Sequence, residues 1–428
     1  MRRRTQRHPQ RLHASAGAEI RRAIVLSCAG AADGDLNLVR SLGSEGVPVT
    51  VFAEYVGAPA AASRYCTEAV VLPSFTESPE RLAAALERYA LAQPCRPVVF
   101  PSADPDLALL SGWRDRLQAS CDLVLARSAL IADLTDKRRF AALARERQLE
   151  VPCTWTASSI DDLRRQADQV RLPVIVKPSN PIHWKTDRIA GLAPASKAIR
   201  VDDPARLETI CHSLLEAGIE FVIQELVPGD DQEHYDLHAF FDRESKPVAW
   251  FTGRKHRIFP VHAGSGCFVE SVAMDALADA GLRMLRELRY TGIANVNYKR
   301  DPRDGRFRLL EINPRVSQWN ILAARCGVNL PWLAYAELSG LPAPPMGRQR
   351  QSVFYLNWRN DRWAYRSYRA EGLLGLSDYL RTLARRPMVY QLLDPEDPWP
   401  FVRTVLSNLL RRLTKSLRSL GLQARPRG

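Results

Sequence analysis

The residues best suited to chemistry lie at the end of an apolar run, in the segment LLEINPR. Glu311, Asn313 and Arg315 occupy alternate positions there, and alternate residues of an extended strand share one face. Carboxylate and amide oxygens suit a hard cation such as Mg²⁺, and a guanidinium can hold a phosphate through two hydrogen bonds. The spacing therefore indicates a metal and phosphate site, with a solvated strand end as the alternative.

Lysines and arginines occupy comparable positions on other predicted elements. Lys177 closes the apolar strand PVIVKP, and Lys137 opens a helix in TDK. A lysine on a buried strand requires a partner or a ligand for its charge, unless its stem carries the ammonium to the surface. Lys255 and Arg257 share one face of the strand GRKHR, where a solvated face is again the alternative.

Asn297 and Glu311 flank the segment DPRDG, whose composition predicts a hairpin turn. The two strands of such a hairpin bring the side-chain oxygens of Asn297 and Glu311 together. Cations and oxygen donors without a covalent nucleophile predict phosphoryl chemistry that works by positioning and charge neutralisation.

Other polar residues carry weaker signals. Asp104, in PSADPD, is expected to lie in a turn or to cap a helix. Four histidines of the central region lack the spacing of metal ligands, and structural roles are expected for them. These are His234, His238, His256 and His262.

The elements that must position these residues fall into successive regions. Residues 1–22 are predicted to form a disordered basic arm. Short apolar strands alternate with helices over 23–133, which predicts a Rossmann-like α/β domain with a parallel sheet and right-handed crossovers. Residues 134–345 have an α+β pattern, with a helix expected at 274–289. After the linker PAPPMG, residues 346–428 are predicted to form an aromatic, basic and helical extension.

Composition and charge exclude several classes of protein. The chain has 428 residues, of which 46% are hydrophobic, and two or three domains are expected. The net charge of +13 comes from the two ends, because residues 1–22 carry +6 and residues 403–428 carry +7. The remainder is neutral, so a nucleic-acid-binding body is not expected. The sequence has no apolar run of membrane-spanning length and no signal-peptide core. Eight cysteines without a CxxC pair predict reduced thiols in a cytoplasmic protein.

With its motifs taken in order, the chain resembles the ATP-grasp superfamily, specifically the branch of carboxylate–amine ligases. The resemblance covers roughly Ala23 to Pro345 and rests on seven segments: FPSADPD, LTDKRRFAALARERQLEVP, LPVIVKP, VIQELVPGDD, FTGRKHRIFPVHAGSG, GIANVNYKRD and LLEINPR. It implies a pre-ATP-grasp α/β domain, a small lysine-bearing lid over about 145–222, and a C-terminal ATP-grasp half. ATP would lie between two antiparallel sheets.

The resemblance also implies a set of nucleotide contacts. Lys137 and Lys177 would contact the phosphates, and QELV would be the hinge that reads adenine. An acid two residues past Gly229 stands where the family usually binds ribose. The implied ATP-binding residues are Lys137, Lys177, Gln224, Glu225, Val227 and Asp231.

Metal and catalytic roles follow in the same way. Glu311 and Asn313 would bind magnesium, with Glu311 bridging two ions and Asn297 as a third ligand. Arg315, with Lys255 or Arg257, would stabilise the transferring phosphate or the acyl phosphate. The implied cofactors are ATP and Mg²⁺, with Mn²⁺ as an alternative metal.

The chain departs from the family pattern in two places. Asn297 stands where most relatives have a carboxylate or a glutamine, which affects one metal site. The segment after Lys177 lacks the glycine-rich phosphate loop of other branches, although Trp184 and Lys197 resemble the ligase branch.

The function implied by the resemblance is an ATP- and Mg²⁺-dependent ligase. It would activate a small-molecule carboxylate as an acyl phosphate and couple it to a small-molecule amine. The alternatives are an ATP-grasp carboxylase, a thiol ligase, or a non-catalytic nucleotide-binding scaffold that its basic tails recruit to a membrane.

The C-terminal region carries one further signal. Apolar residues recur at helical spacing over 401–420, with basic residues between them. Such a basic amphipathic helix can lie on an anionic membrane surface, here the inner membrane face. Packing of the stripe on its own domain, or on a second subunit in a homodimer, is the alternative.

Overall fold

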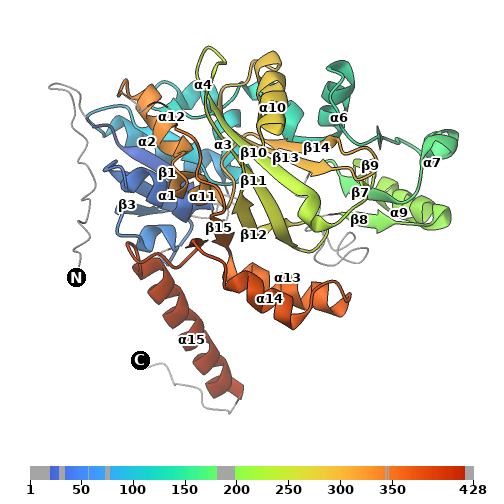
Figure 1. Cartoon of the computed structure of the whole chain (residues 1–428). Helices are drawn as coiled ribbons and strands as arrows, with labels where there is room; N and C mark the ends of the chain where they lie inside the picture. The colour runs from blue at the N-terminus through green and yellow to red at the C-terminus, as the bar shows by residue number, and fades with distance from the viewer. Residues whose placement is uncertain are drawn as a thin grey trace.

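The computed structural model describes residues 20–27, 34–55, 57–72, 78–180, 198–342, 345 and 347–419, without the side chains of 167, 412, 413 and 415–419. Residues 1–19 of the predicted basic arm and the segment 181–197, with Trp184 and Lys197, lie outside the described residues. The described chain contains three sheets, which lie side by side with helices around them (Figure 1).

The first sheet is parallel throughout, as the alternation of strands and helices predicts. Its strand order is β3-β2-β1-β4-β5, and β1 and β2 are buried along their whole length. The strands are β1 (Ala23–Ser27), β2 (Val49–Ala53), β3 (Cys66–Val71), β4 (Val98–Pro101) and β5 (Asp122–Leu123). The helices of this part are α1 (Gly34–Gly43), η1 (Ala60–Ala62), α2 (Pro79–Leu91), α3 (Asp104–Gly112) and α4 (Arg114–Leu117).

Two helices lead from the first sheet to the second. They are α5 (Ser128–Thr135) and α6 (Lys137–Glu146). The carboxylate of Asp136 caps α6 by accepting hydrogen bonds from the backbone N–H groups of Arg138 and Arg139, which satisfies two of the free donors at a helix start. Lys137 therefore opens α6, as predicted.

The second sheet is small and antiparallel, with the order β6-β9-β7-β8. Its strands lie in the segment of about 145–222 for which the resemblance implies a lid, apart from the end of β9, and a compact apolar cluster joins the strands to the helices. The strands are β6 (Thr154–Trp155), β7 (Val174–Pro178), β8 (Ile199–Val201) and β9 (Phe221–Glu225), and the helices are α7 (Ile160–Gln166), η2 (Ala167–Gln169) and α9 (Pro204–Glu216).

The third sheet has seven strands in the order β14-β13-β10-β11-β12-β15-β16. Helix α10 (Asp275–Glu287) covers one of its faces, where Leu237, Val296 and Leu285 share an apolar cluster. The strands of the sheet are β10 (His234–Phe241), β11 (Pro247–Phe259), β12 (Ser265–Ser271), β13 (Gly292–Arg300), β14 (Phe307–Asn313), β15 (Phe354–Leu356) and β16 (Met388–Tyr390). A short 3-10 helix, η4 (Asp231–Glu233), directly precedes β10. The predicted hairpin is β13 with β14.

Helices α11 (Asn320–Arg325) and α12 (Leu330–Leu338) pack between the first and third sheets. Residues Leu330 to Ala336 of α12 are all buried, which is typical of a helix enclosed on every side. The two sheets therefore share one continuous apolar core.

The C-terminal extension differs in part from its predicted helical character. Helices α13 (Trp358–Ala370) and α14 (Leu376–Leu383) lie beneath the third sheet in Figure 1, but β15 and β16 add two strands to that sheet. The aromatic residues divide between core and surface, since Tyr355 and Tyr368 are buried whereas Trp358 and Trp363 are about half exposed.

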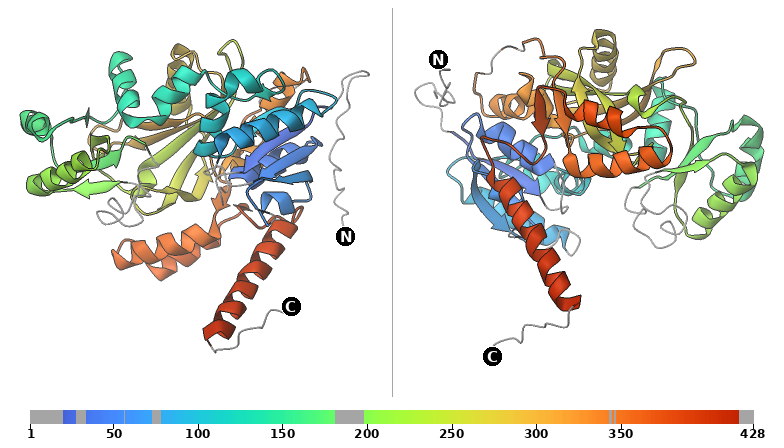
Figure 2. Two further views of the ribbon diagram at one scale, coloured as in Figure 1. Left: turned by 180° about the vertical axis from the view of Figure 1, so that it is seen from behind. Right: turned by 60° about the horizontal axis from the view of Figure 1, so that its bottom comes forward.

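The last helix, α15 (Trp399–Ser419), begins beside η1 and projects from the body, so that its C-terminal end lies clear of the rest of the chain in both views of Figure 2. A buried ion pair anchors the segment before it, since Arg40 Nε of α1 donates to Asp397 at 2.9 Å. Among the described helices, none combines the length and the apolarity needed to cross a bilayer.

Candidate active site

Lys177 and Lys137 come together although forty residues separate them in the sequence. The backbone N–H of Lys137 donates to the carbonyl of Ser179 at 3.2 Å, which holds the start of α6 against the end of β7. Burial and, to a smaller extent, the charge of Lys137 lower the pKa of Lys177 to about 8, although Glu311 opposes both effects. These effects require that the three charged groups lie near one another.

Gln224 positions the ammonium of Lys177 from the neighbouring strand. Lys177 Nζ donates to Gln224 Oε1 at 3.2 Å, and Gln224 Nε2 donates to Thr154 Oγ1 at 3.1 Å. The register of β7 and β9 explains this contact. Gln224 pairs with Ile175, and Lys177, two residues further along β7, lies on the same face of the sheet as Ile175. The small sheet thus presents one lysine with a defined orientation toward the third sheet.

The predicted hinge is fixed by cations that the sequence analysis did not identify. Lys299 Nζ donates to the carbonyl oxygens of Val227 at 2.9 Å and Gly229 at 2.8 Å. Arg303 Nη2 donates to Glu225 Oε1 at 2.6 Å. Burial lowers the pKa of Lys299, so its ammonium is stabilised by these carbonyls and nearby acids. The segment after β9 is therefore tied to β13 and to its turn.

A buried polar network lies on the face of the third sheet opposite α10. Lys255 Nζ contacts Asp236 Oδ1 at 2.8 Å and donates to Asn297 Oδ1 at 2.6 Å. Asn297 Nδ2 donates to Asn295 Oδ1 at 3.0 Å, and Asn295 Nδ2 donates to Asp236 Oδ2 at 3.1 Å. Burial raises the pKa of Asp236, and Lys255 opposes that shift. Three hydrogen bonds and one ion pair thus join the four side chains in a closed ring.

This network changes the interpretation of Asn297. Its amide oxygen, expected to bind metal, instead accepts a hydrogen bond from the Lys255 ammonium, which keeps a second cation away from that oxygen. Asp236 and Asn295 were not identified from the sequence. Both repeat the period of two that singled out Lys255, in YDLHAFF and ANVN, so the same signal was present on neighbouring strands.

Glu311 and Asn313 lie at the edge of this network, on β14. Asn297 is the register partner of Glu311, and Asn295 is that of Asn313, as the hairpin predicts. Asn313 Nδ2 donates to Glu311 Oε1 at 3.2 Å. A register shift between Asn297 and Tyr298 marks a bulge, which re-aims side chains at a strand end. Glu311 is exposed, so its carboxylate is accessible to a ligand.

Arg315 lies just after β14. It connects the site to α3, one of the helices around the first sheet. Its Nε donates to Asp104 Oδ1, at the start of α3, at 2.5 Å. Burial alone would lower the pKa of Arg315, but the Asp104 carboxylate raises it. The guanidinium is therefore a permanent charge at the boundary of two sheets, and Asp104 is its partner in addition to opening α3.

Arg257 does not join the other predicted residues. Its guanidinium forms two hydrogen bonds with Asp361 of α13, at 2.7 and 3.2 Å, and lies 4.3 Å from the ring centroid of Phe268. A register irregularity of β11 on each side of Arg257 separates it from Lys255. Arg257 therefore anchors the C-terminal extension, because α13 supplies the carboxylate that neutralises it.

Asp231 also has partners in the extension. Tyr368 Oη donates to Asp231 Oδ2 at 2.6 Å, and the backbone N–H of His262 donates to the same oxygen at 2.9 Å. Burial alone would raise the pKa of Asp231, but the hydrogen bonds from His262 and Tyr368 lower it to about 2. His262 Nε2 contacts Glu371 at 2.8 Å. The two carboxylates raise the pKa of His262 to about 9, although burial opposes this.

His238 has the structural role expected of it. It is buried, its ring centroid lies 4.1 Å from that of Trp319, and burial together with Lys255 lowers its pKa to about 3. The imidazole is therefore neutral at physiological pH.

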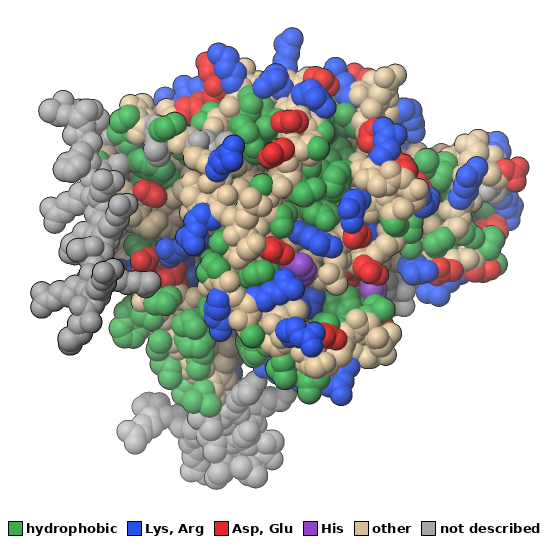
Figure 3. Space-filling view, in the orientation of Figure 1, with side chains coloured by type: hydrophobic (Ala, Val, Ile, Leu, Met, Phe, Trp, Pro, Cys, Tyr) green, Lys and Arg blue, Asp and Glu red, His purple; other side chains and the backbone are tan. Residues whose placement is uncertain are grey.

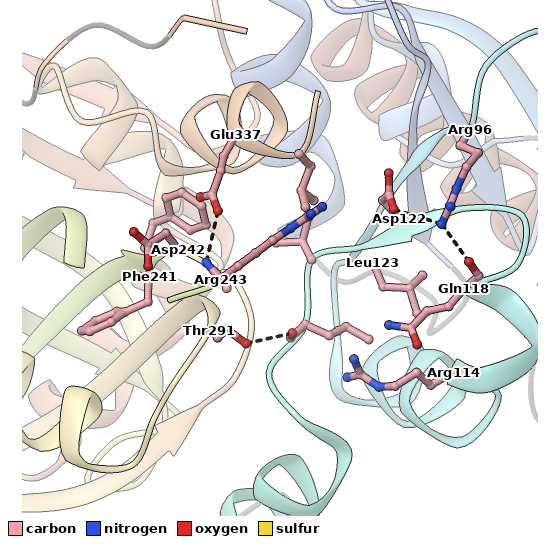
Figure 4. Close-up of a pocket in the computed structure, with 15 residues that line it drawn as sticks. Arg96, Arg114, Gln118, Asp122, Leu123, Phe241, Asp242, Arg243, Thr291 and Glu337 are labelled. Carbon is pink, nitrogen blue, oxygen red and sulfur yellow. Dashed lines mark hydrogen bonds and ion pairs between the residues drawn. The ribbon is translucent and has the colours of Figure 1, made fainter. Parts of the chain in front are cut away.

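A cavity of about 460 Å³ lies elsewhere, between the first sheet and the carboxyl end of β10. Figure 4 shows Glu337 and Arg243 on one side of it and Arg96 and Asp122 on the other. The backbone N–H of Arg243 donates to Glu337 at 3.2 Å, and Arg96 contacts Asp122 at 3.1 Å. This cavity is separate from the site around Lys177 and Glu311.

Comparison with known proteins agrees with this fold. Residues 249–361 match a family model described as ATP-grasp in the biosynthetic pathway with Ter operon. The chain is 25% identical over 271 residues to a D-aspartate ligase of Enterococcus faecium, which covers 61% of this chain and 63% of that ligase. The chain thus spans less than two thirds of that relative.

Solved structures share the fold at low identity. The biotin carboxylase domain of a 2-oxoglutarate carboxylase from Hydrogenobacter thermophilus, in complex with MgADP, ADP and bicarbonate, has a TM-score of 0.60 at 11% identity, over 78% of this chain and 74% of that one. An L-amino acid ligase from Bacillus licheniformis has a TM-score of 0.53 at 15% identity, over 78% of each chain. Residues 249–361 thus match an ATP-grasp family model, and the solved structures show that the chain shares their fold.

Proposed function

We propose that the protein is an ATP- and Mg²⁺-dependent ligase that activates a carboxylate as an acyl phosphate and couples it to an amine. The observation that carries the proposal is the convergence of Lys137 and Lys177 with Glu311, from three separate elements. Two cations and a carboxylate that lie near one another are suited to a triphosphate with a divalent cation. Similarity to a D-aspartate ligase and to an L-amino acid ligase supports carbon–nitrogen bond formation.

In this proposal ATP lies between the small sheet and the third sheet. Lys137 and Lys177 bind its phosphates, and Gln224 orients Lys177. The hinge with Glu225 and the Val227 backbone faces the base. Asp231 is retained as the ribose contact, held in place by its partners in α13.

The donor set at the end of β14 fits Mg²⁺. Glu311 has an exposed carboxylate. The amide nitrogen of Asn313 donates hydrogen bonds to Glu311 and Asn295, so its amide oxygen is the atom that can coordinate the metal. Both are oxygen ligands of the kind Mg²⁺ prefers. The ion, when bound, supplies charge neutralisation for the phosphate oxygens. Asn297 is omitted from this set because Lys255 occupies its oxygen.

The reaction consists of two displacements. A substrate carboxylate oxygen attacks the γ-phosphorus, the bond to the bridging oxygen breaks, and ADP leaves. The amine nitrogen then attacks the acyl carbon, phosphate leaves with the bonding electrons, and the nitrogen loses a proton. The role of Arg315 is to hold the transferring phosphate or the acyl phosphate as a permanent cation, since holding two anions together requires such screening. Lys255 acts through Asn297 and Asp236 rather than by direct contact.

Hydroxylamine trapping tests this proposal. The purified protein, ATP, Mg²⁺ and a panel of amino acids and sugar acids should yield an acyl hydroxamate with the correct acid, together with ADP. Bicarbonate dependence would instead indicate a carboxylase, and formation of an acyl thioester would indicate a thiol ligase. If no acid led to ADP release, the protein would be a non-catalytic scaffold. The same panel, followed by phosphate release, identifies the acid.

We propose three further properties from the sequence. They are the division into regions at residues 133 and 345, a cytoplasmic location, and contact of 401–420 with an inner membrane face. A homodimer is the competing proposal for that helix. Sedimentation of the full-length protein would determine its oligomeric state.

A further inference from the structure

Helix α15 presents an apolar stripe to solvent. Its described large apolar side chains are exposed except that of Val402, which is half-buried, and more than half of the surface of Leu406, Leu409 and Leu410 is accessible. Val405 and Trp399 are exposed to a similar extent. Figure 3 shows hydrophobic side chains gathered where this helix leaves the body. Among the described residues, those of the stripe do not belong to any of the apolar clusters that form the core.

The stripe is therefore not packed on its own domain, which was one alternative from the sequence. The helical spacing of Val402, Val405, Leu406, Leu409 and Leu410 places all five within about 140° of the helix circumference. An exposed stripe of this width is typical of a helix that binds another surface.

Charge distinguishes among the surfaces that this stripe fits. From Trp399 to the end of the sequence the chain contains seven arginines and lysines and no acidic residue. Arg403 borders the stripe, and Arg411 lies on the opposite side of the helix. A second copy of the helix would bring like charges together, whereas an anionic lipid surface neutralises them.

The body holds the start of this helix firmly. Asp397, two residues before α15, is completely buried and accepts hydrogen bonds from Arg40 at 2.9 Å and from Ser63 at 2.7 Å. Pro400 is buried as well. The helix is therefore anchored at one end, beside η1, while its apolar stripe is free for a partner.

We infer that α15 lies in the headgroup region of an anionic bilayer, with its leucine stripe toward the acyl chains and Arg403, at the border of the stripe, toward lipid phosphates. The inference does not rest on the proposed ligase function. Both the apolar area and the positive charge contribute to such binding, so removal of either must weaken it, and salt must weaken the charge-dependent part.

Vesicle co-sedimentation of the full-length protein tests the inference. We expect binding to vesicles that contain phosphatidylglycerol to exceed binding to pure phosphatidylcholine at least ~10-fold. The variant Leu406→Ser/Leu409→Ser/Leu410→Ser should lose binding to both. The variant Arg403→Gln/Arg411→Gln should still bind, but with a smaller preference for phosphatidylglycerol, because it lacks two of the seven basic residues. The matched control Leu376→Ser/Leu380→Ser, which alters exposed leucines of α14, should bind as the wild type does.

Two results would overturn the inference. One is equal sedimentation of the wild type and the triple serine variant. The other is a wild-type dimer in light scattering that the triple serine variant converts to monomer, without vesicle binding by either. Thermal unfolding of each variant controls for folding, and the substituted side chains are exposed, so stability should change little.

Discussion

The phenol of Tyr368, on α13, donates a hydrogen bond of 2.6 Å to the carboxylate of Asp231, 137 residues earlier in the chain. The same carboxylate accepts a hydrogen bond from the backbone N–H of His262. An acid expected at the nucleotide is thus positioned by a helix of the C-terminal extension. The extension is therefore part of the structure that holds the site together.

Replacing Tyr368 with phenylalanine tests this connection. The variant should lose about 1 kcal/mol of unfolding free energy, because one hydrogen bond to a buried carboxylate is removed. If Asp231 contacts the nucleotide, KM for ATP should rise about fivefold while kcat stays the same. Tyr365→Phe, on the same helix, is the matched control. An unchanged KM in Tyr368→Phe would show that Asp231 acts only in the fold.

His262 should make stability depend on pH. Its pKa is raised from 6.5 to about 9 in the folded protein by Asp231 and Glu371, so the folded state binds the proton more tightly than the unfolded state. This contribution is fully present below pH 6.5 and is lost as the pH rises through about 9. Thermal unfolding of wild type and His262→Asn should therefore converge above pH 9. The side chain is about half exposed, so solvent reduces the difference. A constant difference across this range would contradict the prediction.

Glu311→Ala should abolish substrate-dependent ADP release, a loss of at least ~10²-fold, because it removes the proposed metal ligand. The side chain is exposed, so the free energy of unfolding should stay within about 0.5 kcal/mol of the wild type. Glu244→Ala, in the exposed turn between β10 and β11, is the control. Turnover retained in Glu311→Ala would count against the whole assignment.

Lys177 should make ATP binding weaken with rising pH. Its pKa in the unliganded protein is about 8, and phosphate oxygens favour the ammonium form, so affinity should fall between pH 7 and pH 9. Lys177→Met should bind ATP ~10-fold or more weakly at pH 7 and show a flatter profile. Lys246→Met, at an exposed turn, is the control for titration calorimetry.

The folding effect of Lys177 has the opposite sign. Its folded pKa lies below the ordinary 10.5, so between about pH 8 and 10.5 the unfolded state holds the extra proton, and stability gains as pH rises. Lys177→Met should remove that gain from the unliganded protein. A variant with the wild-type slope in both binding and stability would exclude Lys177 as the titrating group.

The buried pair of Arg257 and Asp361 should dominate the attachment of α13. Either Arg257→Met or Asp361→Leu alone should cost ~3–5 kcal/mol, since each leaves an unpaired buried charge. The double variant should cost much less than the sum, because both charges are removed together. Urea unfolding of the four proteins measures this coupling, and additive losses would refute it.

Periodicity and turn composition were sufficient to predict the parallel sheet, the β13–β14 hairpin and the pairing of Asn297 with Glu311. These features depend on local sequence, and the structure has them in the predicted order. The approach of Lys177 and Lys137 to Glu311 agrees with the family resemblance rather than with any local pattern. The alternation of side chains along a strand predicts which residues share a face, but it does not predict which residue each side chain contacts.

Arg257 and Asn297 illustrate that limit. Arg257 has the same spacing as a ligand-binding residue, but its neighbour is Asp361, 104 residues away. Asn297 has the oxygen of a metal ligand, but the register of β10 and β11 brings Lys255 to it. The role of each residue is determined by its contact with a strand or helix distant in the sequence, and the local sequence does not predict that contact.

The contact between Arg40 and Asp397 has a consequence for synthesis of the protein on the ribosome. Arg40 donates to Asp397 and to the carbonyls of Gln391 and Leu392, which are translated at least 351 residues after it. Until that segment leaves the ribosome, the guanidinium of Arg40 lacks its counter-charge, so its burial is strongly unfavourable. The packing around α1 is therefore completed only after residue 397 has been translated.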